Sequence, residues 1–374
     1  MKIAINASNL HLGGGIQVAA SFLHSLLDGD HDAGAFSVFA SSEVDRNLRD
    51  AGADPRGFGG YQVHDVYGMS AFRDARLRQL DDYDVVFTIF GPAYLSLRRA
   101  RSVVGFAQAW ILYPDNDMAQ RLPVLRRYLT RLKFHLQWLV FRRADALVVE
   151  AEHVRRGLVA RGYPAQHIHV APNCIAAVYL DASRWQPIDH KVDPGIINIG
   201  FVGRDWVHKN TDLLPEVTAI LHQRYGLQVR FHVTFTAEEW LAKSPHFREV
   251  VTNAGPLSVA QCPTFYRMMD GVIFPSLLEC FSVTPLEALV MERPLFASAR
   301  SFVTELCGDH GHYFDPLDPG SIAAVIADYY RGGRDQAETA RQRLQAGRAH
   351  ALAFSNPQAR AQQYLAAIKA VAAH

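Results

Sequence analysis

Short runs of apolar residues alternate with amphipathic stretches along the first half of the chain. These runs cover residues 3–7, 36–40, 85–89, 103–106, 146–149 and 168–171. Most are continuous rather than alternating, which indicates strands buried on both faces, as in a parallel sheet covered by helices. Helical patterns separate the runs, as in the stretch 16–27. The first half is therefore predicted to be a doubly wound α/β domain.

The same pattern restarts in the second half, after a polar passage at 181–195 that contains Gln186-Pro187 and Asp193-Pro194-Gly195. Such a passage is typical of a linker. Further apolar runs follow at 196–202, 229–235, 272–274 and 295–297. With 374 residues the chain is long enough for two domains. We assign them to 1–180 and 196–355, and we expect a terminal helix within 356–374.

Two glutamates, Glu279 and Glu287, follow the apolar run 271–274. The run predicts a strand, residues 275–283 the loop at its carboxyl end, and 285–289 the first turn of a helix. Ligands of open α/β sheets bind at such a place. Helix amides attract phosphate there, and a carboxylate accepts hydrogen bonds from sugar hydroxyls. As an alternative, Thr284-Pro285-Leu286-Glu287 also fits a helix capping box.

Two cations mark a second turn between a strand and a helix. The strand at 196–202 ends in Gly203-Arg204, and His208-Lys209-Asn210 opens the next helical pattern. Arginine offers a planar fork to phosphate oxygens and lysine a compact charge. This turn therefore suits a departing diphosphate.

Together these segments resemble the retaining glycosyltransferases of family 4. The matching segments are HLGGGIQVAA, VAPNCI, FVGRDWVHKN, PSLLECFSVTPLEAL and TELCGDHGHYFDPLDPGSIAAVI. The resemblance runs from the glycine-rich loop to near Asp318. It implies the GT-B fold, in which two Rossmann-like domains face each other across a cleft. It also implies that the first domain binds the acceptor, that the second binds a nucleotide sugar, and that the terminal helix crosses back to the first domain.

The resemblance also implies roles for individual residues. Arg204 and Lys209 match the pair that holds the donor diphosphate, Glu279 the glutamate that contacts the transferred sugar, and Glu287 the glutamate that contacts the ribose. The other positions expected to bind the donor are Gly13, Gly14, Gly15, Gly203, Phe281, Ser282, Val283 and Thr284.

This chain departs from the family pattern at two places. It has Cys280 and Ser282 where many members have glycine, so its loop backbone is less free. Gln108 stands in the segment where many members carry a His-Asp pair. A glutamine side chain cannot act as a base, so we expect Gln108 to supply only a polar contact to the donor sugar or acceptor.

Several candidates keep two interpretations from sequence. The loop Gly13-Gly14-Gly15 is either a plain tight turn or a close backbone approach to a ligand, and His11 beside it is expected to be a solvated loop residue rather than a base. Asn173 either lines the cleft or ties the domain junction, or forms an Asx turn. Glu305 either lies near the donor or is solvated at a helix end.

No metal or cofactor is expected beyond the nucleotide-sugar substrate. Asp115-Asn116-Asp117 resembles the metal-binding DxD motif of glycosyltransferases with the other major fold, but it lacks the strand setting that such a site needs. Arg204 and Lys209 already supply the charge that a metal would supply.

A basic stretch without acidic residues covers 118–144. Its cations are Arg121, Arg126, Arg127, Arg131, Lys133, Arg142 and Arg143. Its apolar positions, Leu125, Leu129, Leu132, Leu136 and Leu139, are spaced alternately by four and three, which predicts a helix with one buried face. The basic face is either solvated or, together with Arg98, Arg99 and Arg101, meets anionic lipid or a diphosphate-linked acceptor.

The composition narrows the functional classes. A net charge of +1 argues against general nucleic-acid binding. The four cysteines have no zinc-ligand spacing, and the chain opens directly with a strand, so we expect a reduced, cytoplasmic protein, at most peripheral to the inner face of a membrane. No apolar run is long enough to cross a bilayer.

The prediction from sequence is a retaining, metal-independent hexosyltransferase of bacterial surface-polysaccharide synthesis. By resemblance of GFAQAWILYPDN and LLECFSVTPLEA, the favoured donor is GDP-mannose or a GDP-deoxyhexose, and the acceptor is a glycan or lipid-linked glycan. Two alternatives stay open, namely an epimerase or hydrolase of the same fold and a non-catalytic sugar-nucleotide-binding protein. A dinucleotide-dependent oxidoreductase is disfavoured because no matching glycine fingerprint follows a strand.

Overall fold

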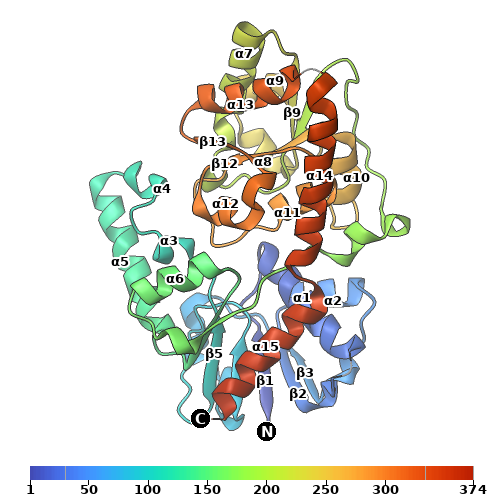
Figure 1. Ribbon diagram of the computed structural model, residues 1–374. Helices are drawn as coiled ribbons and strands as arrows, with labels where there is room; N and C mark the ends of the chain where they lie inside the picture. The colour runs from blue at the N-terminus through green and yellow to red at the C-terminus, as the bar shows by residue number, and fades with distance from the viewer. Residues whose placement is uncertain (30, 333, 374) are drawn as a thin grey trace. The chain divides into compact units, whose positions relative to one another are not determined.

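The computed structural model describes residues 1–29, 31–332 and 334–373, and for 334–337 only the backbone. The chain forms two compact units, each built around one parallel sheet (Figure 1). The first unit comprises 1–114, 122–174 and 355–374, and the second comprises 115–121 and 175–354. The division falls at 174/175, earlier than the predicted end of the first domain at 180, and the predicted linker lies in the second unit. Each unit is a Rossmann-like α/β domain, so the predicted fold class is confirmed.

The first unit contains a seven-stranded parallel sheet in the order β3-β2-β1-β4-β5-β6-β7. Its strands are β1 Ile3–Ala7, β2 Phe36–Ala40, β3 Gly60–Val63, β4 Val85–Thr88, β5 Arg101–Gly105, β6 Ala146–Val149 and β7 Ile168–Val170. Six of them match the predicted runs to within two residues at each end. The seventh, β3, is an edge strand whose four residues are half-buried or exposed, so it has no apolar run to reveal it.

Helices cover both faces of this sheet (Figure 1). They are α1 Gly14–Asp28, α2 Ser42–Asp50, α3 Ala109–Leu112, α5 Val124–Phe141, α6 Glu152–Ala160 and α15 Pro357–Ala372. The terminal helix α15 packs on α1 and the sheet, where the Tyr364 ring lies 5.0 Å from Phe22 and 5.1 Å from Phe87. Tyr364, Leu365 and Ile368 belong to the same apolar core as the strands.

The second unit contains a six-stranded parallel sheet in the order β10-β9-β8-β11-β12-β13. Its strands are β8 Ile197–Gly200, β9 Val229–Val233, β10 Val251–Asn253, β11 Gly271–Phe274, β12 Leu295–Ser298 and β13 His312–Phe314. Its helices are α4 Asp117–Gln120, α7 Leu214–Tyr225, α8 Ala237–Ala242, α9 Pro245–Val250, α10 Cys262–Met268, α11 Thr284–Val290, α12 Ser301–Cys307, α13 Pro319–Arg331 and α14 Arg334–Phe354. The sequence missed β10 and β13, two edge strands of three residues.

The strand order reverses once in each sheet. In the first unit the reversal lies between β1 and β4, and in the second it lies between β8 and β11. Loops leave a parallel sheet in opposite directions at such a reversal, which opens a crevice outside the carboxyl ends of the two strands. These two places are therefore where each unit is built to hold a ligand.

The basic helix departs from its prediction. The expected helix at 118–144 is two helices, α4 and α5, with a break before Pro123. The five leucines expected in the core, Leu125, Leu129, Leu132, Leu136 and Leu139, are instead 41% to 72% exposed. The prediction of a buried leucine face was wrong, because Trp138 and Phe141, on the other side of α5, make the contact with the domain.

Candidate active site

The predicted donor residues of the second unit follow the two strands at its reversal. Gly203 and Arg204 come directly after β8, and Lys209 ends a short 3-10 helix, Val207–Lys209. The loop with Glu279 follows β11. The Leu277 amide donates a hydrogen bond to the His208 carbonyl at 2.8 Å, which ties the two loops together.

Lys209 and Glu279 form a close ion pair. The Lys209 Nζ atom lies 2.6 Å from Glu279 Oε1, and the two side chains are only 10% and 14% exposed. Lys209 also lies over the Phe274 ring, 5.3 Å from its centre. The His208 Nε2 atom is 3.6 Å from the same carboxylate oxygen, but burial lowers the pKa of His208. The cation facing Glu279 at neutral pH is therefore Lys209.

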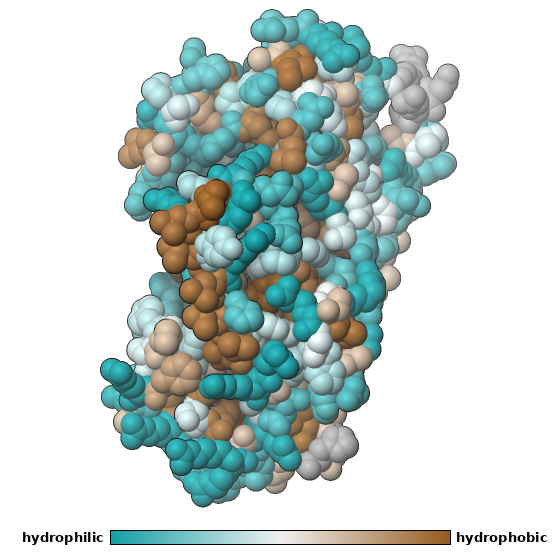
Figure 2. All heavy atoms as spheres, turned by 90° about the vertical axis from the view of Figure 1, so that its left-hand side faces the viewer, coloured by the Kyte–Doolittle hydropathy of each residue, from teal (hydrophilic) through white to brown (hydrophobic). Residues whose placement is uncertain are grey.

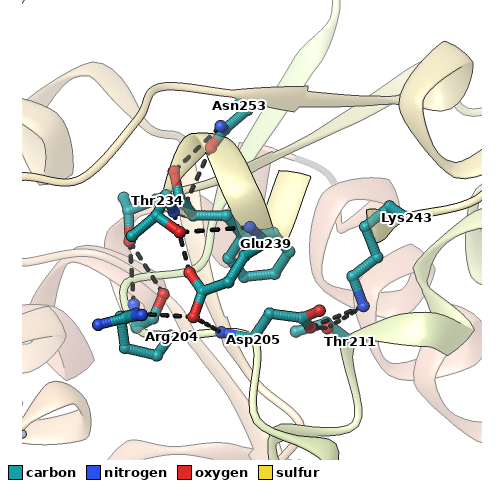
Figure 3. Close-up of polar contacts among 10 residues, drawn as sticks. Arg204, Asp205, Thr211, Thr234, Glu239, Lys243 and Asn253 are labelled. Atoms are coloured by element: carbon teal, nitrogen blue, oxygen red, sulfur yellow. Dashed lines mark hydrogen bonds and ion pairs between the residues drawn. The ribbon is translucent and has the colours of Figure 1, made fainter. Parts of the chain in front are cut away.

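Arg204 is held by a carboxylate that the sequence did not reveal as part of the site. Its Nε group donates to Glu239 Oε1 at 2.7 Å, and the Asp205 amide donates to the same oxygen at 3.3 Å (Figure 3). Among the described residues neither Nη group of Arg204 has a hydrogen bond, and its side chain is 47% exposed. The Nε end of the guanidinium is thus fixed by Glu239, while the two Nη groups are free to contact a ligand.

Glu239 is itself positioned by a capping box at the start of α8. Its backbone amide donates to Thr236 Oγ1, and the Thr236 amide donates to Glu239 Oε2 at 2.9 Å. The sequence Thr236-Ala237-Glu238-Glu239 carries this signature, so a search for capping boxes after apolar runs would have located the residue. Glu239 therefore stabilises the start of α8 and also positions Arg204, the residue predicted to bind the diphosphate.

Glycine is required at position 203. Its φ of 155° is rare for other residues, and a Cβ atom there would lie 3.1 Å from the Phe201 ring. Its amide donates to Thr234 Oγ1 at 3.0 Å. The turn that brings Arg204 to the edge of the sheet depends on this conformation.

A second ionic cluster holds the loop after Arg204. Buried Lys243 lies 2.6 Å from Asp205 (Figure 3). It also lies 2.6 Å from Asp212, and its ammonium packs on the Phe247 ring. Thr211 Oγ1 donates to Asp205 at 2.9 Å. These contacts leave Asp205 and Lys243 satisfied within the protein, so we assign them to the scaffold of the loop.

The loop from Glu279 to the start of α11 packs closely. Phe281 stacks on Phe354 with ring centres 6.2 Å apart, and Cys280 is buried. Ser282 and Val283 are half-buried, and Thr284 is buried as the first residue of α11. The side chains of this segment hold the loop in place, while Ser282 and Val283 keep part of their surface accessible.

Glu287 is not a capping residue. The helix α11 begins at Thr284 without any side-chain cap, so the capping-box alternative is wrong. Instead, Glu287 Oε2 accepts a hydrogen bond from the Tyr266 hydroxyl at 2.9 Å. Burial raises the pKa of Glu287 to about 7, and the bond from Tyr266 only partly opposes this shift.

This raised pKa predicts a pH-dependent contribution to stability. The folded protein binds a proton at Glu287 more tightly than the unfolded chain, so this term lowers the free energy of unfolding as pH rises from about 4.5 to about 7. His232 and His312, whose pKa values burial lowers to about 4, act in the opposite direction.

The measurement is therefore a comparison of chemical unfolding of the wild type and Glu287→Gln from pH 4.5 to 8. The wild type should lose stability relative to the variant up to about pH 7, and the difference should then level off. A difference that grows in favour of the wild type over this range would contradict the assignment.

In the first unit, the Gly13-Gly14-Gly15 loop leads from β1 into α1. Gly13 has a φ of 77°, and a Cβ atom on Gly14 would meet nothing within 4 Å. Gly13 and Gly14 are exposed, whereas a Cβ on Gly15 would lie 3.3 Å from the Phe90 ring. The exposure of Gly13 and Gly14, with open space beside Gly14, fits the predicted approach of a ligand to the backbone. The nearby His11 is half-buried, stacks on Tyr67 and bonds the Val66 carbonyl, so it is not a solvated residue.

Asn173 anchors the terminal helix. Its Oδ1 atom accepts from Arg360 Nη1 of α15 at 2.5 Å and from the Cys174 amide at 2.8 Å. Arg360 is 2% exposed and also donates to Ser21 Oγ at 2.7 Å. Glu150 lies close to this guanidinium, yet burial raises its pKa to about 7. The sequence had not linked Asn173 to the terminal helix, because the pairing partner is distant in the chain.

The remaining candidates occupy ordinary structural positions. Gln108 is the half-buried residue before α3, and Glu305 is exposed on α12. In the acidic motif, Asn116 caps α4 and Asp117 accepts from Arg300 Nη2 at 2.9 Å. Asp117 is thus engaged by a cation within the second unit.

Comparison with known families agrees with this architecture. The model described as "Glycosyltransferase Family 4" matches residues 12–177, and the model described as "Glycosyl transferases group 1" matches residues 197–331. The protein is a family 4-like glycosyltransferase with the GT-B fold. Each matched range lies almost entirely in one of the two units.

Individual proteins are also similar to this chain, at low sequence identity. The D-inositol 3-phosphate glycosyltransferase of Pseudarthrobacter chlorophenolicus is 28% identical over 177 residues, which is 45% of this chain and 41% of that relative. Anabaena HepE in complex with UDP-glucose superposes over 99% of this chain and 100% of its own with a TM-score of 0.71 and 15% identity. Sucrose-phosphate synthase of Thermosynechococcus elongatus superposes over 97% of this chain and 97% of its own, with a TM-score of 0.67 and 15% identity.

The helices were compared with the length and hydropathy that a membrane span needs. Among the helices of the described residues, none combines the length and the apolar character needed to cross a bilayer.

Proposed function

We propose that this glycosyltransferase moves a hexose from a nucleotide sugar to a glycan acceptor with retention of the anomeric configuration and without a metal ion. The observation that carries the proposal is the juxtaposition at the β8/β11 reversal of a buried Lys209–Glu279 pair and a half-exposed Arg204. Two cations at a strand reversal suit a diphosphate, and a carboxylate beside one of them suits sugar hydroxyls.

The proposed chemistry divides among these residues. The guanidinium fork of Arg204 and the ammonium of Lys209 stabilise the negative charge that develops on the leaving diphosphate. Glu279 accepts hydrogen bonds from the transferred sugar. As the bond from the anomeric carbon to the diphosphate oxygen breaks, the acceptor oxygen bonds to that carbon on the same face. The acceptor proton passes to the leaving diphosphate, so no protein base is needed.

Glu287 and the glycine loop complete the proposed donor contacts. Glu287 binds the ribose hydroxyls, and Tyr266 fixes its carboxylate at 2.9 Å. The exposed backbone at Gly13 and Gly14 accommodates a polar part of the donor or acceptor. Phe281, Ser282, Val283 and Thr284 shape the loop between Glu279 and Glu287.

The donor is proposed to be GDP-mannose or a GDP-deoxyhexose, on the resemblance of the segments 105–116 and 277–288 to surface-polysaccharide transferases. The HepE structure holds UDP-glucose, so UDP-sugars are the main competing class. Thermal-shift measurements against GDP-, UDP- and ADP-sugars test the proposal, because a ligand of the folded state alone raises the melting temperature. A stable protein that no nucleotide sugar stabilises would overturn the proposed function.

We also propose that α5 lies on an anionic membrane surface, where a lipid-linked acceptor would be found. The exposed apolar residues Val124, Leu125, Tyr128, Leu129, Leu132, Leu136 and Leu139 fall within an arc of about 140° on an ideal helix. Arg127 and Arg131 border this arc on one side and Arg126 and Lys133 on the other. Figure 2 shows hydrophobic residues gathered in a stripe on the face where α5 lies. Such a stripe with flanking cations is typical of an interfacial helix.

The membrane proposal predicts a large effect of charge reversal. The triple variant Arg126→Glu, Arg127→Glu, Arg131→Glu should no longer bind anionic liposomes, because each cation near the surface contributes about 1 kcal/mol to membrane binding. Transfer to a short soluble acceptor should stay almost unchanged. Co-sedimentation at rising salt is the measurement, and binding of the wild type should weaken as charges are screened within about 10 Å at 0.1 M.

A matched control reverses three exposed arginines elsewhere, Arg73, Arg78 and Arg224, with the same change in net charge. This control should keep binding liposomes. Equal release of both triple variants, or no liposome binding by the wild type, would return α5 to a solvated surface helix.

A further inference from the structure

Asn210, the residue directly after Lys209, has a left-handed backbone conformation. Its φ of 57° and ψ of 33° lie in the region that glycine favours, and Glu292 is the only other described non-glycine residue with a positive φ. Asparagine tolerates this conformation better than most residues. Asn210 stands between the 3-10 helix Val207–Lys209 and the next one, Thr211–Leu213. Its conformation thus ends the short helix at Lys209 and sets the direction in which the chain continues.

The side chain of Asn210 is buried and bonds a segment that is far away in the sequence. It is 8% exposed, and its Nδ2 group donates to the Pro316 carbonyl at 2.7 Å. Pro316 is itself buried, in the turn that follows β13. A buried carbonyl is costly to leave without a donor, so this bond holds the two segments together.

The Pro316 carbonyl is a fixed acceptor, because hydrogen bonds hold the turn that carries it. The Leu317 amide donates to Asp315 Oδ1 at 3.0 Å, and the Asp318 amide donates to the Asp315 carbonyl at 3.2 Å. The Asp315 amide donates to Ser321 Oγ of α13 at 3.1 Å. The turn is thus braced against α13, and it offers the loop of Lys209 an independent point of attachment.

Lys209 is held in place from both sides. The residue before it, His208, accepts a hydrogen bond from the loop of Glu279 at 2.8 Å, and the residue after it is Asn210 with its own bond at 2.7 Å. The Lys209 side chain is only 10% exposed and packs over the Phe274 ring, so it has little room to compensate for a backbone shift with another rotamer. Such a shift would separate the ammonium from the Glu279 oxygen that it contacts at 2.6 Å.

Asparagine is the residue type that meets both requirements at position 210. Glycine would adopt the conformation more easily, but it has no side chain to reach the Pro316 carbonyl. Aspartate has the same size and tolerates the conformation, but its ionised carboxylate has no hydrogen to donate. Alanine meets neither requirement. The position therefore needs a residue that tolerates a positive φ and also carries a side-chain donor.

We propose that Asn210 is a positioning residue for Lys209. Its left-handed backbone and its bond to Pro316 hold the Lys209 ammonium beside Glu279, where the ammonium balances the charge of the leaving diphosphate. The catalytic consequence rests on the proposed function, whereas the placement of the ammonium does not. Asn210 acts through Lys209 and needs no contact of its own with the donor.

The first test removes the bond of Asn210 and keeps its backbone conformation. Asn210→Asp and Asn210→Gly should each lower kcat about tenfold, the effect of one lost hydrogen bond. The ratio kcat/KM should fall with kcat, because the ammonium acts mainly in the transition state. Initial rates of the full-length chain, with the nucleotide sugar that thermal-shift screening selects, are the measurement. Normal turnover of both variants would overturn the proposal.

The second test separates the positioning of Lys209 from a general loss of structure. Lys209→Met removes the ammonium and keeps the bulk of the side chain. In this background Asn210→Asp should have no further effect on kcat, because the effects of residues that act as a unit are not additive. A merely structural role would lower kcat by the same factor in both backgrounds, and the positioning role would then be wrong.

A third measurement needs no transfer activity. Asn210→Asp should lower the melting temperature of the wild type, and it should lower that of Glu279→Gln by less. The reason is that the ion pair that depends on the placement of Lys209 is already weakened when Glu279 is neutral. Equal losses in the two backgrounds would show that Asn210 does not place the ammonium.

Asn47→Asp is the matched control. Asn47 lies on α2 in the first unit, and its Nδ2 group also donates to a backbone carbonyl, that of Glu43, at 2.9 Å. The variant loses the same kind of bond with the same change in charge, and it should leave kcat and the KM for the donor unchanged. A fall in kcat equal to that of Asn210→Asp would contradict a specific role of Asn210.

The outcome is separable from that of the proposed function. If Lys209→Met keeps full turnover while the losses of melting temperature differ between the two backgrounds, the proposed chemistry fails and the placement of Lys209 by Asn210 stands. If Lys209→Met nearly abolishes transfer while Asn210→Asp and Asn210→Gly turn over normally, the positioning role fails and the proposed chemistry stands.

Discussion

Replacing Glu279 by glutamine should lower transfer by about 10²–10³-fold, the size expected when one preorganised polar group is lost from a transition state. A neutral amide accepts hydrogen bonds from sugar hydroxyls less strongly than a carboxylate. The change keeps the size of the side chain, so Lys209 can still donate to its oxygen across the present 2.6 Å contact. Initial rates with the natural donor are the measurement.

The structure raises a competing explanation, which the experiment must separate. Glu279 could simply neutralise the buried ammonium of Lys209, in which case its loss would lower the melting temperature more than the rate. Glu249→Gln, an exposed carboxylate on α9, is the matched control and should change neither quantity. Near-normal turnover of Glu279→Gln together with a lower melting temperature would make Glu279 a structural partner of Lys209 alone.

Most of the fold followed from the pattern of apolar runs, because strands buried on both faces have no polar positions to disguise them. The runs at Ile3–Ala7 and Ala146–Val149 are strands at those residues. Edge strands behave differently. Gly60–Val63 is half exposed, and Val251–Asn253 and His312–Phe314 contain only three residues each, so neither length nor apolarity marks them.

The basic helix shows what periodicity cannot decide. The spacing of the leucines on α5 correctly indicated one apolar side, but spacing carries no information about what covers that side. The domain packs against Trp138 and Phe141 instead, and the leucines stay exposed. An apolar stripe in a sequence therefore predicts burial only when no second apolar side competes for the core.

The candidate site was predictable where its residues lie in short motifs. Lys209 and Glu279, 70 positions apart, meet at 2.6 Å because β8 and β11 are neighbours, which the motifs imply through the fold. Glu239 and Tyr266 were missed because their contacts to Arg204 and Glu287 depend on how distant segments pack.

Arg204→Ala is the cleaner of two tests of the diphosphate site. Arg204 is 47% exposed, so its removal should leave stability nearly unchanged while turnover falls by roughly 10²-fold or more. Lys209→Ala should lower turnover as much but also destabilise the fold, because it leaves the Glu279 carboxylate buried without its partner. Arg224→Ala, another exposed arginine of the second unit, should change neither rate nor stability.

The same assay decides whether protein cations or a metal ion balance the diphosphate charge. If Arg204 and Lys209 do so, transfer should continue in EDTA. Glu239→Gln should then weaken donor binding, because Arg204 Nε loses the carboxylate that holds the guanidinium in position. Loss of activity in EDTA that manganese restores would instead favour the acidic pair Asp115 and Asp117. Asp117 would then have to leave Arg300, which it contacts at 2.9 Å, so Arg300→Ala should in that case tighten the apparent affinity for manganese.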